Sequence, residues 1–378
     1  MFTPNPNGRR VIIVDVSHIC MALAFSNHKL SHSVYLEGVG SITYDTTIMN
    51  GVIKNIYHWS NKGSNPIVVC FDSSGCNRAR KYYFTNQAKK YGVEDSVEYK
   101  SKRGTQSNSY FEEVNRTRDL LVNSGVTVYE NHSYEADDLV FGAVQTAKIQ
   151  YPDLPIDVVT SDLDLAPLVD DQVSVFIRSP KLDYATDESI AKKHYQQLTP
   201  KTYQRFLEGR SSLKGLKVPY NTILLSKLLR GDKSDAVPAF KKFTPTKYNN
   251  LIDNLIADGV DVADLFRYDR PTEIFMYRGT QNVVPVEAYP TLTNNDIDIY
   301  YWDSKKLTEI TTVLSKYLDE PIIEHIKFVY NGIALGTSFT DAPLEYTRKP
   351  TYIPTVGNGF NPAKMMEEAS KFGITLRY

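Results

Sequence analysis

The 378-residue chain is poor in cysteine, and its three cysteines, Cys20, Cys70 and Cys76, show no CxxC spacing. So sparse a set argues against a disulfide framework and a thiolate zinc site, and it suits a reducing compartment. No uninterrupted apolar run approaches the length of a membrane span. The apolar stretch near the N-terminus is interrupted by Asp15 and His18, and no small-residue cleavage site follows it. These absences predict a cytoplasmic protein with no membrane partner.

Several catalytic motifs are missing as well. The sequence contains no GxSxG, no GxxxxGKS/T and no HExxH, and its seven histidines are scattered. His18 and His132 lie near the acidic residues described below, and we expect a structural role for each. The net charge of −1 and the pI of 6.7 give no whole-chain sign of a polyanionic partner. Any chemistry therefore depends on local clusters of side chains.

The first half of the chain is rich in short β-branched runs that alternate with helical patterns. These runs occupy residues 10–16, 66–72, 126–131, 156–162 and 172–178. Continuous apolar runs separated by helix-length segments are typical of strands buried on both faces of a parallel sheet. Helices are predicted at about 45–60, 109–124, 134–149 and 163–169, with Ser133 as the N-cap of the third. The pattern predicts an α/β domain with a mainly parallel sheet.

The strand pattern ends at about residue 190, and helical patterns with loops between them follow. We therefore predict an α/β domain over residues 1–190, a mainly helical domain over 191–345 and a C-terminal tail over 346–378. The tail is rich in Pro, Gly and Asn before a final helical pattern. Residues 73–108 form a long insertion at the edge of the sheet where ligands bind, and we expect them to form an arch or lid.

Acidic residues stand at the ends of successive predicted strands. They are Asp15, Asp72, Glu135, Asp137, Asp138, Asp162 and Asp164. In an open parallel sheet the carboxyl ends of the strands line one edge, where binding sites form, so these acids should converge on one cleft. Asp232 and Asp235 of "GDKSD" are expected to complete the cleft from the second domain. A single Asp at a strand end is more often a cap or turn residue, so the prediction depends on their recurrence.

Carboxylates this close together repel one another unless cations are present. Mg²⁺ prefers oxygen ligands and keeps several waters, so each ion needs few carboxylates. Seven to nine acids suit two Mg²⁺ ions, for which Mn²⁺ is expected to substitute. Two ions about 3.5–4 Å apart can activate a water and stabilise the leaving oxygen in phosphodiester hydrolysis.

Basic residues gather on both sides of these acids, in segments 78–103 and 201–250. This arrangement suits a phosphate chain held on both sides of a metal site. Aromatic residues interleave with the first segment and are expected to stack on unpaired bases. These aromatics are Tyr82, Tyr83, Phe84 and Tyr91. The alternative, that the charges form a solvated face and the aromatics pack beneath a loop, stays open.

The motifs together resemble the 5′-nuclease superfamily of flap endonucleases and 5′–3′ exonucleases, and most of all the ribonuclease H type of T-even phages. In family order, from residue 11 to residue 238, they are "VIIVDVS", "VVCFD", "YKSKR", "YEADD", "VTSDLD" and "GDKSDAVP". The resemblance implies a PIN-like α/β nuclease domain, a helical arch and a helix–three-turn–helix element that holds duplex. It also implies metal-dependent removal of 5′ ends, flaps or RNA primers in DNA replication or repair.

The resemblance implies roles for individual residues. Asp15, Asp72, Glu135, Asp137 and Asp162 would serve the first metal, and Asp138, Asp164, Asp232 and Asp235 the second. Asp15, Asp137 and Asp162 would act in catalysis with Lys100 and Arg103, which would contact the scissile phosphate. Nucleic acid would be bound by Arg78, Arg80, Lys81, Lys102, Lys233, Lys241 and Lys242; either Arg78 or Arg80 would be the arginine of the arch.

The chain departs from the family pattern just after "GDKSD". Ala236 and Ala239 stand where the family usually has an Asn and a Gly, and "FKKFTPTKY" replaces a glycine-rich hairpin. Without those glycines the backbone approaches a phosphate less closely, which puts the usual monovalent-cation site in doubt. Lys241 and Lys242 are expected to hold the strand by charge instead.

The expected partners are DNA with a 5′ flap or 5′ end and RNA–DNA hybrid, bound by a monomer. A single-strand DNA-binding protein is expected to dock on the tail. Two other functions stay open: a catalytically inactive DNA-binding accessory protein on the same fold, and a PIN-type ribonuclease that acts on transcripts.

Overall fold

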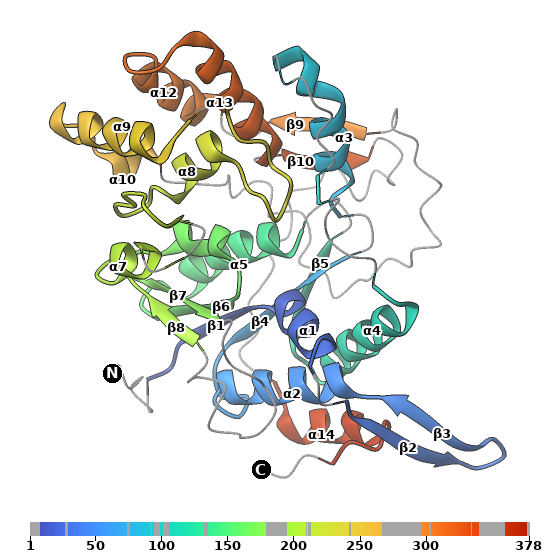
Figure 1. The fold of residues 1–378 in the computed structure, drawn as a ribbon. Coiled ribbons are helices and arrows are strands. Elements are labelled where there is room, and N and C mark those ends of the chain that lie inside the picture. Colours follow the sequence, from blue (N-terminus) through green and yellow to red (C-terminus); the bar gives the residue numbers. More distant parts are fainter. Residues whose placement is uncertain are drawn as a thin grey trace.

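The computed structural model of the protein describes most of the chain. The described residues are 8–26, 29–73, 76–91, 93, 99–100, 106–131, 135–178, 195–208, 210, 213–241, 243–266, 297–301, 304–333, 335–339 and 360–375. Within these ranges a central sheet is flanked by helices, with a second group of helices above the sheet in the view of Figure 1. None of the described helices combines the length and apolarity needed to cross a membrane.

The central sheet has six strands in the order β5-β4-β1-β6-β7-β8. Their bounds are β1 (Val11–Asp15), β4 (Ile67–Asp72), β5 (Thr127–Asn131), β6 (Ile156–Thr160), β7 (Val173–Arg178) and β8 (Tyr195–Leu198). The first five strands in this order run parallel, as predicted, and β8 pairs antiparallel with β7. The five predicted strands are thus confirmed.

Both faces of the sheet are buried, which explains the continuous apolar runs. In β1, Ile12 and Val14 belong to one apolar cluster and Val11 and Ile13 to the other. The first cluster includes residues of α1 (Val16–Ala24), α2 (Thr47–Trp59) and α4 (Asn108–Asn123), and the second includes residues of α5 (Ala136–Gln150). Successive side chains of a strand point to opposite faces, so a two-sided core requires an apolar residue at every position.

Three of the four predicted helices are confirmed as α2, α4 and α5. The fourth is a short 3₁₀ helix, η2 (Leu163–Leu168), which contains Pro167 and begins at an Asp162 cap. Proline removes a backbone donor and clashes with the preceding turn, so an α-helix is disfavoured there. The predicted N-cap of α5 also moves: the cap is Glu135, in a capping box with Asp138, and Ser133 lies outside the described residues.

The second region is mainly helical, as predicted. Its helices are α7 (Tyr203–Glu208), α8 (Ile223–Arg230), α9 (Pro245–Ala257), α10 (Val262–Leu265), α12 (Ser304–Leu314) and α13 (Glu320–Ile333). Residues 231–244, which begin with the "GDKSD" motif, join α8 to α9. The prediction that strands stop at about residue 190 was wrong. Besides β8, β9 (Ile297–Tyr301) pairs antiparallel with β10 (Leu335–Phe339), a partner distant in the chain.

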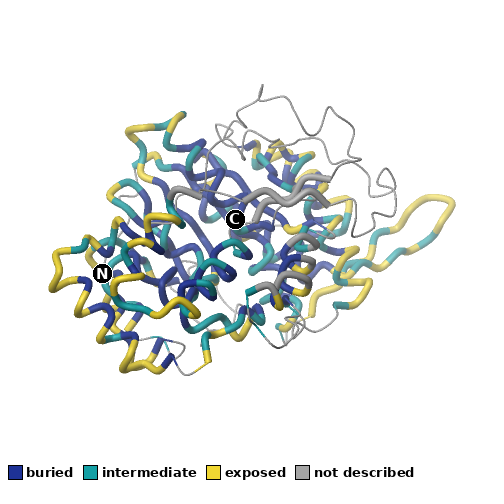
Figure 2. The backbone as a smooth tube through the Cα atoms, turned by 90° about the horizontal axis from the view of Figure 1, so that it is seen from above, coloured by how far each residue is buried: buried dark blue, intermediate teal, exposed yellow. Residues whose placement is uncertain are grey.

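An unpredicted hairpin follows α1. It consists of β2 (Ser31–Leu36) and β3 (Gly40–Asp45), which pair antiparallel across a turn where Gly38 has φ +79° and Gly40 has φ +97°. The hairpin extends away from the body of the molecule (Figure 1), and its tip is exposed in the view of Figure 2. Each strand has only six residues and no fully buried position, so its signal in the sequence is weaker than that of the buried apolar runs.

The predicted arch segment, 73–108, contains α3 (Arg78–Gln87) and the 3₁₀ helix η1 (Ala88–Tyr91). Tyr83 and Phe84 are fully buried, so the expectation that they stack on bases was wrong. Their rings pack against Phe328 of α13, at centroid distances of 5.5 Å each. Gly332 makes room for them, because a Cβ there would lie 2.3 Å from the Phe84 ring. The aromatic residues of this segment therefore attach α3 to the helical region.

Among the remaining aromatics of the segment, Tyr91 is partly buried and packs against Phe328 as well, at 5.4 Å between ring centroids. The side chain of Tyr82 lies outside the described part of the chain. At the other end of the protein, α14 (Pro362–Ser370) packs against α4, and its Met365 is fully buried. The final helical pattern of the predicted tail thus contributes to the core beneath the sheet, and residues 346–359 lie outside the description.

Candidate metal centre

Four of the predicted acids line one cavity of about 370 Å³ at the carboxyl edge of the sheet: Asp15, Asp72, Asp137 and Asp162. Asp15 and Asp72 end β1 and β4, Asp162 follows β6, and Asp137 lies in the first turn of α5. The predicted convergence of strand ends is confirmed for these four residues. The same cavity is lined by Ser17, His18, Met21, Ala22, Phe25, Lys100, Ser161 and Arg178.

Asp15 is buried and held in place by its neighbours. Its Oδ2 accepts a hydrogen bond from Thr160 Oγ1 at 2.9 Å and lies 3.6 Å from Nδ1 of His18. Burial alone raises the pKa of Asp15, but the hydrogen bonds and charge of His18 and the Thr160 hydroxyl outweigh it and lower the pKa. The second oxygen, Oδ1, is buried without a hydrogen-bond partner. A buried carboxylate oxygen left unpaired costs free energy, and a cation would satisfy it.

His18 has the structural role expected of it. Its Nδ1 is hydrogen-bonded to the carbonyl oxygen of Asp15, and its Nε2 lies 3.2 Å from the hydroxyl of Tyr195 in β8.

The other three acids of the cavity have raised pKa values. Burial raises the pKa of Asp137 well above its usual range, and the negative charge of Asp162 adds to the effect. Burial and the charge of Asp164 raise the pKa of Asp162 to about 7. The pKa of Asp72 is also raised, mainly by burial, although Lys100 and a 2.7 Å hydrogen bond from the Ala136 N–H oppose this. These carboxylates lack sufficient positive charge at neutral pH.

Glu135 and Asp138 face basic side chains instead. Glu135 forms ion pairs with Lys100 and Arg80, and its Oε2 accepts a hydrogen bond from Tyr99 at 3.1 Å. Burial alone raises the pKa of Glu135, but the charges of Lys100 and Arg80 reverse this and lower it strongly. Asp138 accepts a hydrogen bond from Arg80 Nη2 at 2.8 Å and one from the Glu135 backbone N–H at 3.0 Å. Both predicted ligands therefore have protein partners in this conformation.

This arrangement corrects the prediction for Arg80. The residue is only 5% exposed, and its guanidinium also donates to the carbonyl oxygen of Ile333 at 3.2 Å. A buried guanidinium with three oxygen partners is not on a nucleic-acid-binding surface. Arg80 instead ties α3 to the first turn of α5 and the end of α13.

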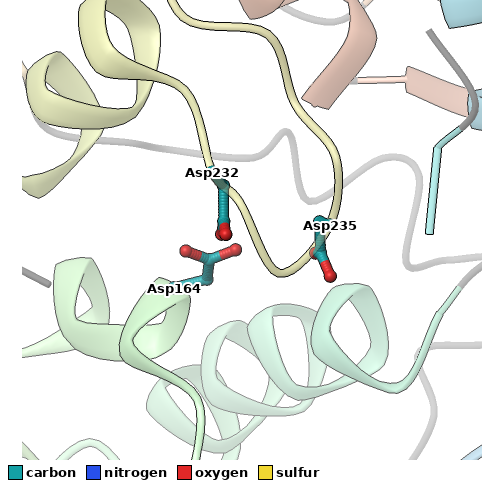
Figure 3. Close-up of side chains that lie close together, drawn as sticks. All are labelled: Asp164, Asp232 and Asp235. Atoms are coloured by element: carbon teal, nitrogen blue, oxygen red, sulfur yellow. The ribbon is translucent and has the colours of Figure 1, made fainter. Parts of the chain in front are cut away.

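A second acidic cluster lies next to the cavity. One carboxylate oxygen each from Asp164, Asp232 and Asp235 lie within 4.8 Å of one another, and Figure 3 shows the three side chains facing a common space. Asp164 belongs to η2, whereas Asp232 and Asp235 come from the loop after α8. The structure thus brings the "GDKSD" loop back to the sheet edge, as predicted.

Local backbone geometry places this loop. Gly231 ends α8 with φ +67°, and a Cβ there would lie 2.4 Å from the carbonyl oxygen of Val237, so only glycine fits. Asp232 and Val237 exchange two backbone hydrogen bonds, of 3.0 and 2.8 Å, which close the loop. The Lys100 N–H donates to the carbonyl oxygen of Asp235 at 2.9 Å. The end of the arch segment and the acidic loop are therefore directly joined.

Two site residues were not singled out from the sequence. Lys227, in the last turn of α8, forms an ion pair with Asp164 and lies 3.4 Å from Asp232. Arg178 ends β7 and lines the acidic cavity. The strand-end argument that identified the acids applies equally to Arg178. For Lys227, its position on a helix five residues before Asp232 could have indicated that it lies near the acidic loop.

The remaining predicted residues are placed as follows. Three of them are exposed lysines. Lys81 lies on α3, Lys233 lies in the acidic loop, and Lys241 lies just beyond that loop. Arg78 lies in α3, but its side chain is outside the described part, as are Lys102, Arg103 and Lys242. The roles of these residues stay predictions.

The donors present fit a hard divalent cation. All are carboxylates, one of them with an unpaired buried oxygen, and three reach a common point. Oxygen-only donor sets of this kind suit Mg²⁺ or Mn²⁺ better than softer metals.

Comparison with known proteins places this geometry in a family. Residues 10–197 match the model of the 5′–3′ exonuclease, N-terminal resolvase-like domain. DNA polymerase I of Mycobacterium bovis and DNA polymerase I of Mycobacterium tuberculosis are each 27% identical over 183 residues. The matched part covers 45% of this chain and 18% of each polymerase, so the chain spans less than a fifth of their length.

Two solved structures from bacteriophage T5 are similar at low identity. One is a flap endonuclease in a pseudo-enzyme–product complex with DNA and metal ions (TM-score 0.45), and the other is a 5′-exonuclease with bound zinc (TM-score 0.44). Each is 11% identical, over 86% of this chain and 90% of the T5 chain.

The family match covers the whole sheet, and the acidic cavity lies within it. The chain belongs to the 5′-nuclease superfamily, and its residues 10–197 form a PIN-like, resolvase-type domain of the 5′–3′ exonuclease family.

Proposed function

We propose that the protein is a divalent-metal-dependent 5′ nuclease that hydrolyses phosphodiesters at 5′ ends, flaps or RNA primers of duplex or branched DNA. The observation that carries the proposal is the meeting of Asp15, Asp72, Asp137 and Asp162 in one cavity, although they are far apart in the chain. The raised pKa values of Asp137 and Asp162 indicate that the cavity needs more positive charge than Lys100 and Arg178, which also line it, provide. Two divalent cations would supply that charge.

Two groups of residues would hold the cations. Asp15, Asp72, Asp137 and Asp162 would hold the first, with Asp15 offering its unpaired Oδ1, and Asp164, Asp232 and Asp235 would hold the second. When bound, two such ions lower the pKa of a water and neutralise charge on the leaving oxygen. The carboxylates would fix the positions of the cations at the sheet edge, while Lys100 and Arg178, which line the same cavity, are placed to attract the phosphate. Glu135 and Asp138 would act one step away, by orienting Lys100 and Arg80.

Lys100 is placed to assist the reaction. Its ammonium lines the cavity, and the surrounding carboxylates and Tyr99 raise its pKa despite burial, so it stays charged. A fixed positive charge at this position would stabilise the negative charge that develops on the scissile phosphate. Arg103, three residues further along the predicted arch, is proposed to act beside it.

Substrate grip is proposed for the exposed lysines around the cleft. Lys233 lies within the acidic loop between α8 and α9, Lys241 lies just beyond it, and Lys81 lies on α3. Phosphate contacts of this kind supply affinity without sequence specificity. Because the loop also carries Asp232 and Asp235, binding of duplex by the helical region would be coupled to the metal centre.

The test is cleavage of 5′-labelled flaps by the purified protein with Mg²⁺ or Mn²⁺. Matched DNA–DNA and RNA–DNA substrates would show the cut position from product sizes. Cleavage near the 5′ end or flap junction that chelator stops would support the proposal. Binding without cleavage would instead indicate the inactive accessory protein, which the altered residues after Asp235 favour. Cleavage of RNA hairpins in preference to DNA flaps would indicate the PIN-type ribonuclease.

Several narrower expectations belong to the same proposal. They are an arch formed by residues 73–108, the domain boundaries near residues 190 and 345, a monomeric and cytoplasmic state, and docking of a single-strand DNA-binding protein on the tail. The packing of α3 on α13 supports an attached arch.

A further inference from the structure

Lys227 reaches the second acidic cluster from the last turn of α8. Its ammonium forms an ion pair with Oδ2 of Asp164 and lies 3.4 Å from Oδ2 of Asp232, and the charge of Asp235 also acts on it. The Lys227 side chain is only 14% exposed. One positive charge therefore contacts two of the three carboxylates of the cluster and acts electrostatically on the third.

For Asp232, the oxygen that Lys227 contacts is the one that a cation could use. The other oxygen of Asp232, Oδ1, already accepts hydrogen bonds from the Ser234 N–H at 2.8 Å and from its hydroxyl at 2.5 Å. Its Oδ2, which faces Lys227, is thus the oxygen available to a ligand from outside the loop. A divalent cation that binds this cluster must displace the ammonium or share its oxygens.

The helix that carries Lys227 cannot move away to make room. Leu224, Leu225, Leu228 and Leu229 of α8 are buried in the core, so only the lysine side chain can withdraw. The four-carbon stem allows this movement at the cost of breaking the ion pairs. Those ion pairs must be replaced by cation–carboxylate bonds, and this exchange weakens net binding of the cation.

We propose that the Lys227 ammonium is the built-in counter-cation of the Asp164–Asp232–Asp235 cluster and competes with the second divalent cation for the same oxygens. The inference rests on the proposed function, which places a cation at this cluster. It deepens that function by ordering the binding. The Asp15–Asp72–Asp137–Asp162 cavity fills first, and the Lys227 cluster fills last and most weakly. Lys227 is a positioning residue in this scheme.

The test is a titration of the full, metal-stripped chain with Mn²⁺ in the absence of DNA. The electron paramagnetic resonance signal of free Mn²⁺ measures how much of the ion is bound. The wild type should show one tighter and one weaker class of site. Lys227→Met should tighten the weaker class about tenfold or more, and Asp232→Asn should remove it. If Lys227 only held the cluster in shape, its replacement would weaken Mn²⁺ binding. An increase in Mn²⁺ affinity is therefore specific to competition between Lys227 and the cation.

Lys148→Met is the matched control. Lys148 is also partly buried and paired with an aspartate, Asp170, but it lines a separate cavity that none of the cluster residues lines. This variant should bind Mn²⁺ like the wild type. If Lys227→Met does not fold without cation, Lys227→Gln, which keeps N–H donors toward Asp164, should fold and tighten the weaker class by a smaller factor, about threefold.

The outcomes separate this inference from the proposed function. In one outcome, the wild type shows two classes of Mn²⁺ site while neither Lys227 variant increases the affinity of the weaker class. This result would overturn the inference and leave the nuclease proposal standing. A wild-type chain that binds no Mn²⁺, or binds it equally well after Asp162→Asn and Asp232→Asn, would overturn both.

Discussion

The two halves of the acidic cleft differ in how their carboxylates are balanced. At the sheet edge, burial and neighbouring negative charges raise the pKa of Asp137 and Asp162. In the loop after α8, burial has the same direction of effect on Asp232, but Lys227 and Ser234 outweigh it and lower the pKa of Asp232. At the sheet edge, the positive charge of Lys100 does not outweigh burial and the repulsion between carboxylates for Asp137, whereas in the loop Lys227 and Ser234 outweigh burial for Asp232.

This difference follows from how each half is built. The sheet-edge acids extend from the ends of parallel strands and from the start of α5, so their positions are set by the sheet whether or not a cation is present. The loop acids lie beside the last turn of a helix, within reach of a long basic side chain. We infer that the sheet edge is the part of the cleft that depends most on divalent cation. Three experiments can break or sharpen this comparison.

The largest effect is expected from Asp162→Asn, which removes a carboxylate from the sheet-edge half. Flap cleavage with Mg²⁺ should fall by about 10³-fold or more, because loss of a metal ligand removes several kcal/mol of transition-state stabilisation. DNA affinity, measured in Ca²⁺, should stay the same or increase, since one negative charge near the phosphates is lost. Asp153→Asn, an exposed residue just before β6, is the control and should cut like the wild type. Undiminished cleavage by Asp162→Asn would defeat the assignment.

A smaller effect is expected from Lys100→Ala, at the junction of the two halves. Removal of the ammonium should slow hydrolysis by about 10²-fold, the usual loss when one electrostatic stabiliser of a transition state is deleted. Binding of the flap should change by about threefold or less. Single-turnover rates and equilibrium binding measure the two effects separately, with exposed Lys54→Ala on α2 as the control for general loss of positive charge. If binding falls more than the rate does, Lys100 grips the substrate and does not assist its cleavage.

The smallest effect is a pH dependence of stability that arises from Asp162 at the sheet edge. The pKa of Asp162 is about 7 in the folded protein, whereas a solvated aspartate ionises near pH 4. Between about pH 4 and pH 7 the folded chain therefore holds a proton that the unfolded chain has released. Its stability decreases as the pH rises through this window. Without divalent cation, the melting temperature of the wild type should therefore fall between about pH 5 and pH 8. The fall should be a few degrees larger than that of Asp162→Asn over the same range.

Saturating Mg²⁺ should raise the wild-type melting temperature and remove this pH-dependent difference, because the cation binds only the folded state and replaces the proton. Circular dichroism melts in chelator and in Mg²⁺ provide the comparison. Parallel curves for wild type and Asp162→Asn across this pH range would contradict the raised pKa. No effect of Mg²⁺ on either curve would argue against a cation at the sheet edge.

The elements that were predicted correctly share one property: their signal is local. The strands buried on two faces appear as apolar runs, and the acids at their ends could be assigned to one edge by the geometry of a parallel sheet. The errors concern pairings between distant or short segments. The β9–β10 pair joins residues more than thirty positions apart, and β2–β3 has few buried positions to mark it.

The same distinction applies within the site. Arg80 and Lys81 are neighbours of similar charge, yet the first is buried in an ion-pair network and the second is exposed. Tyr83 and Phe84 fill the core between α3 and α13, although their composition equally suited base stacking. In each case the residue type determined which interactions the side chain can make, but it did not determine which residue the side chain contacts.

The amino-acid sequence by itself determined the parallel sheet and the row of acids along its carboxyl edge, because burial on two faces and strand direction depend on contiguous residues. Only the tertiary structure decided which cation balances which carboxylate: Arg80 and Lys100 on Glu135, and Lys227 on Asp164 and Asp232. The physical reason is that ion pairing depends on distance and burial in space, and both depend on how α3, α8 and α13 pack against the sheet domain.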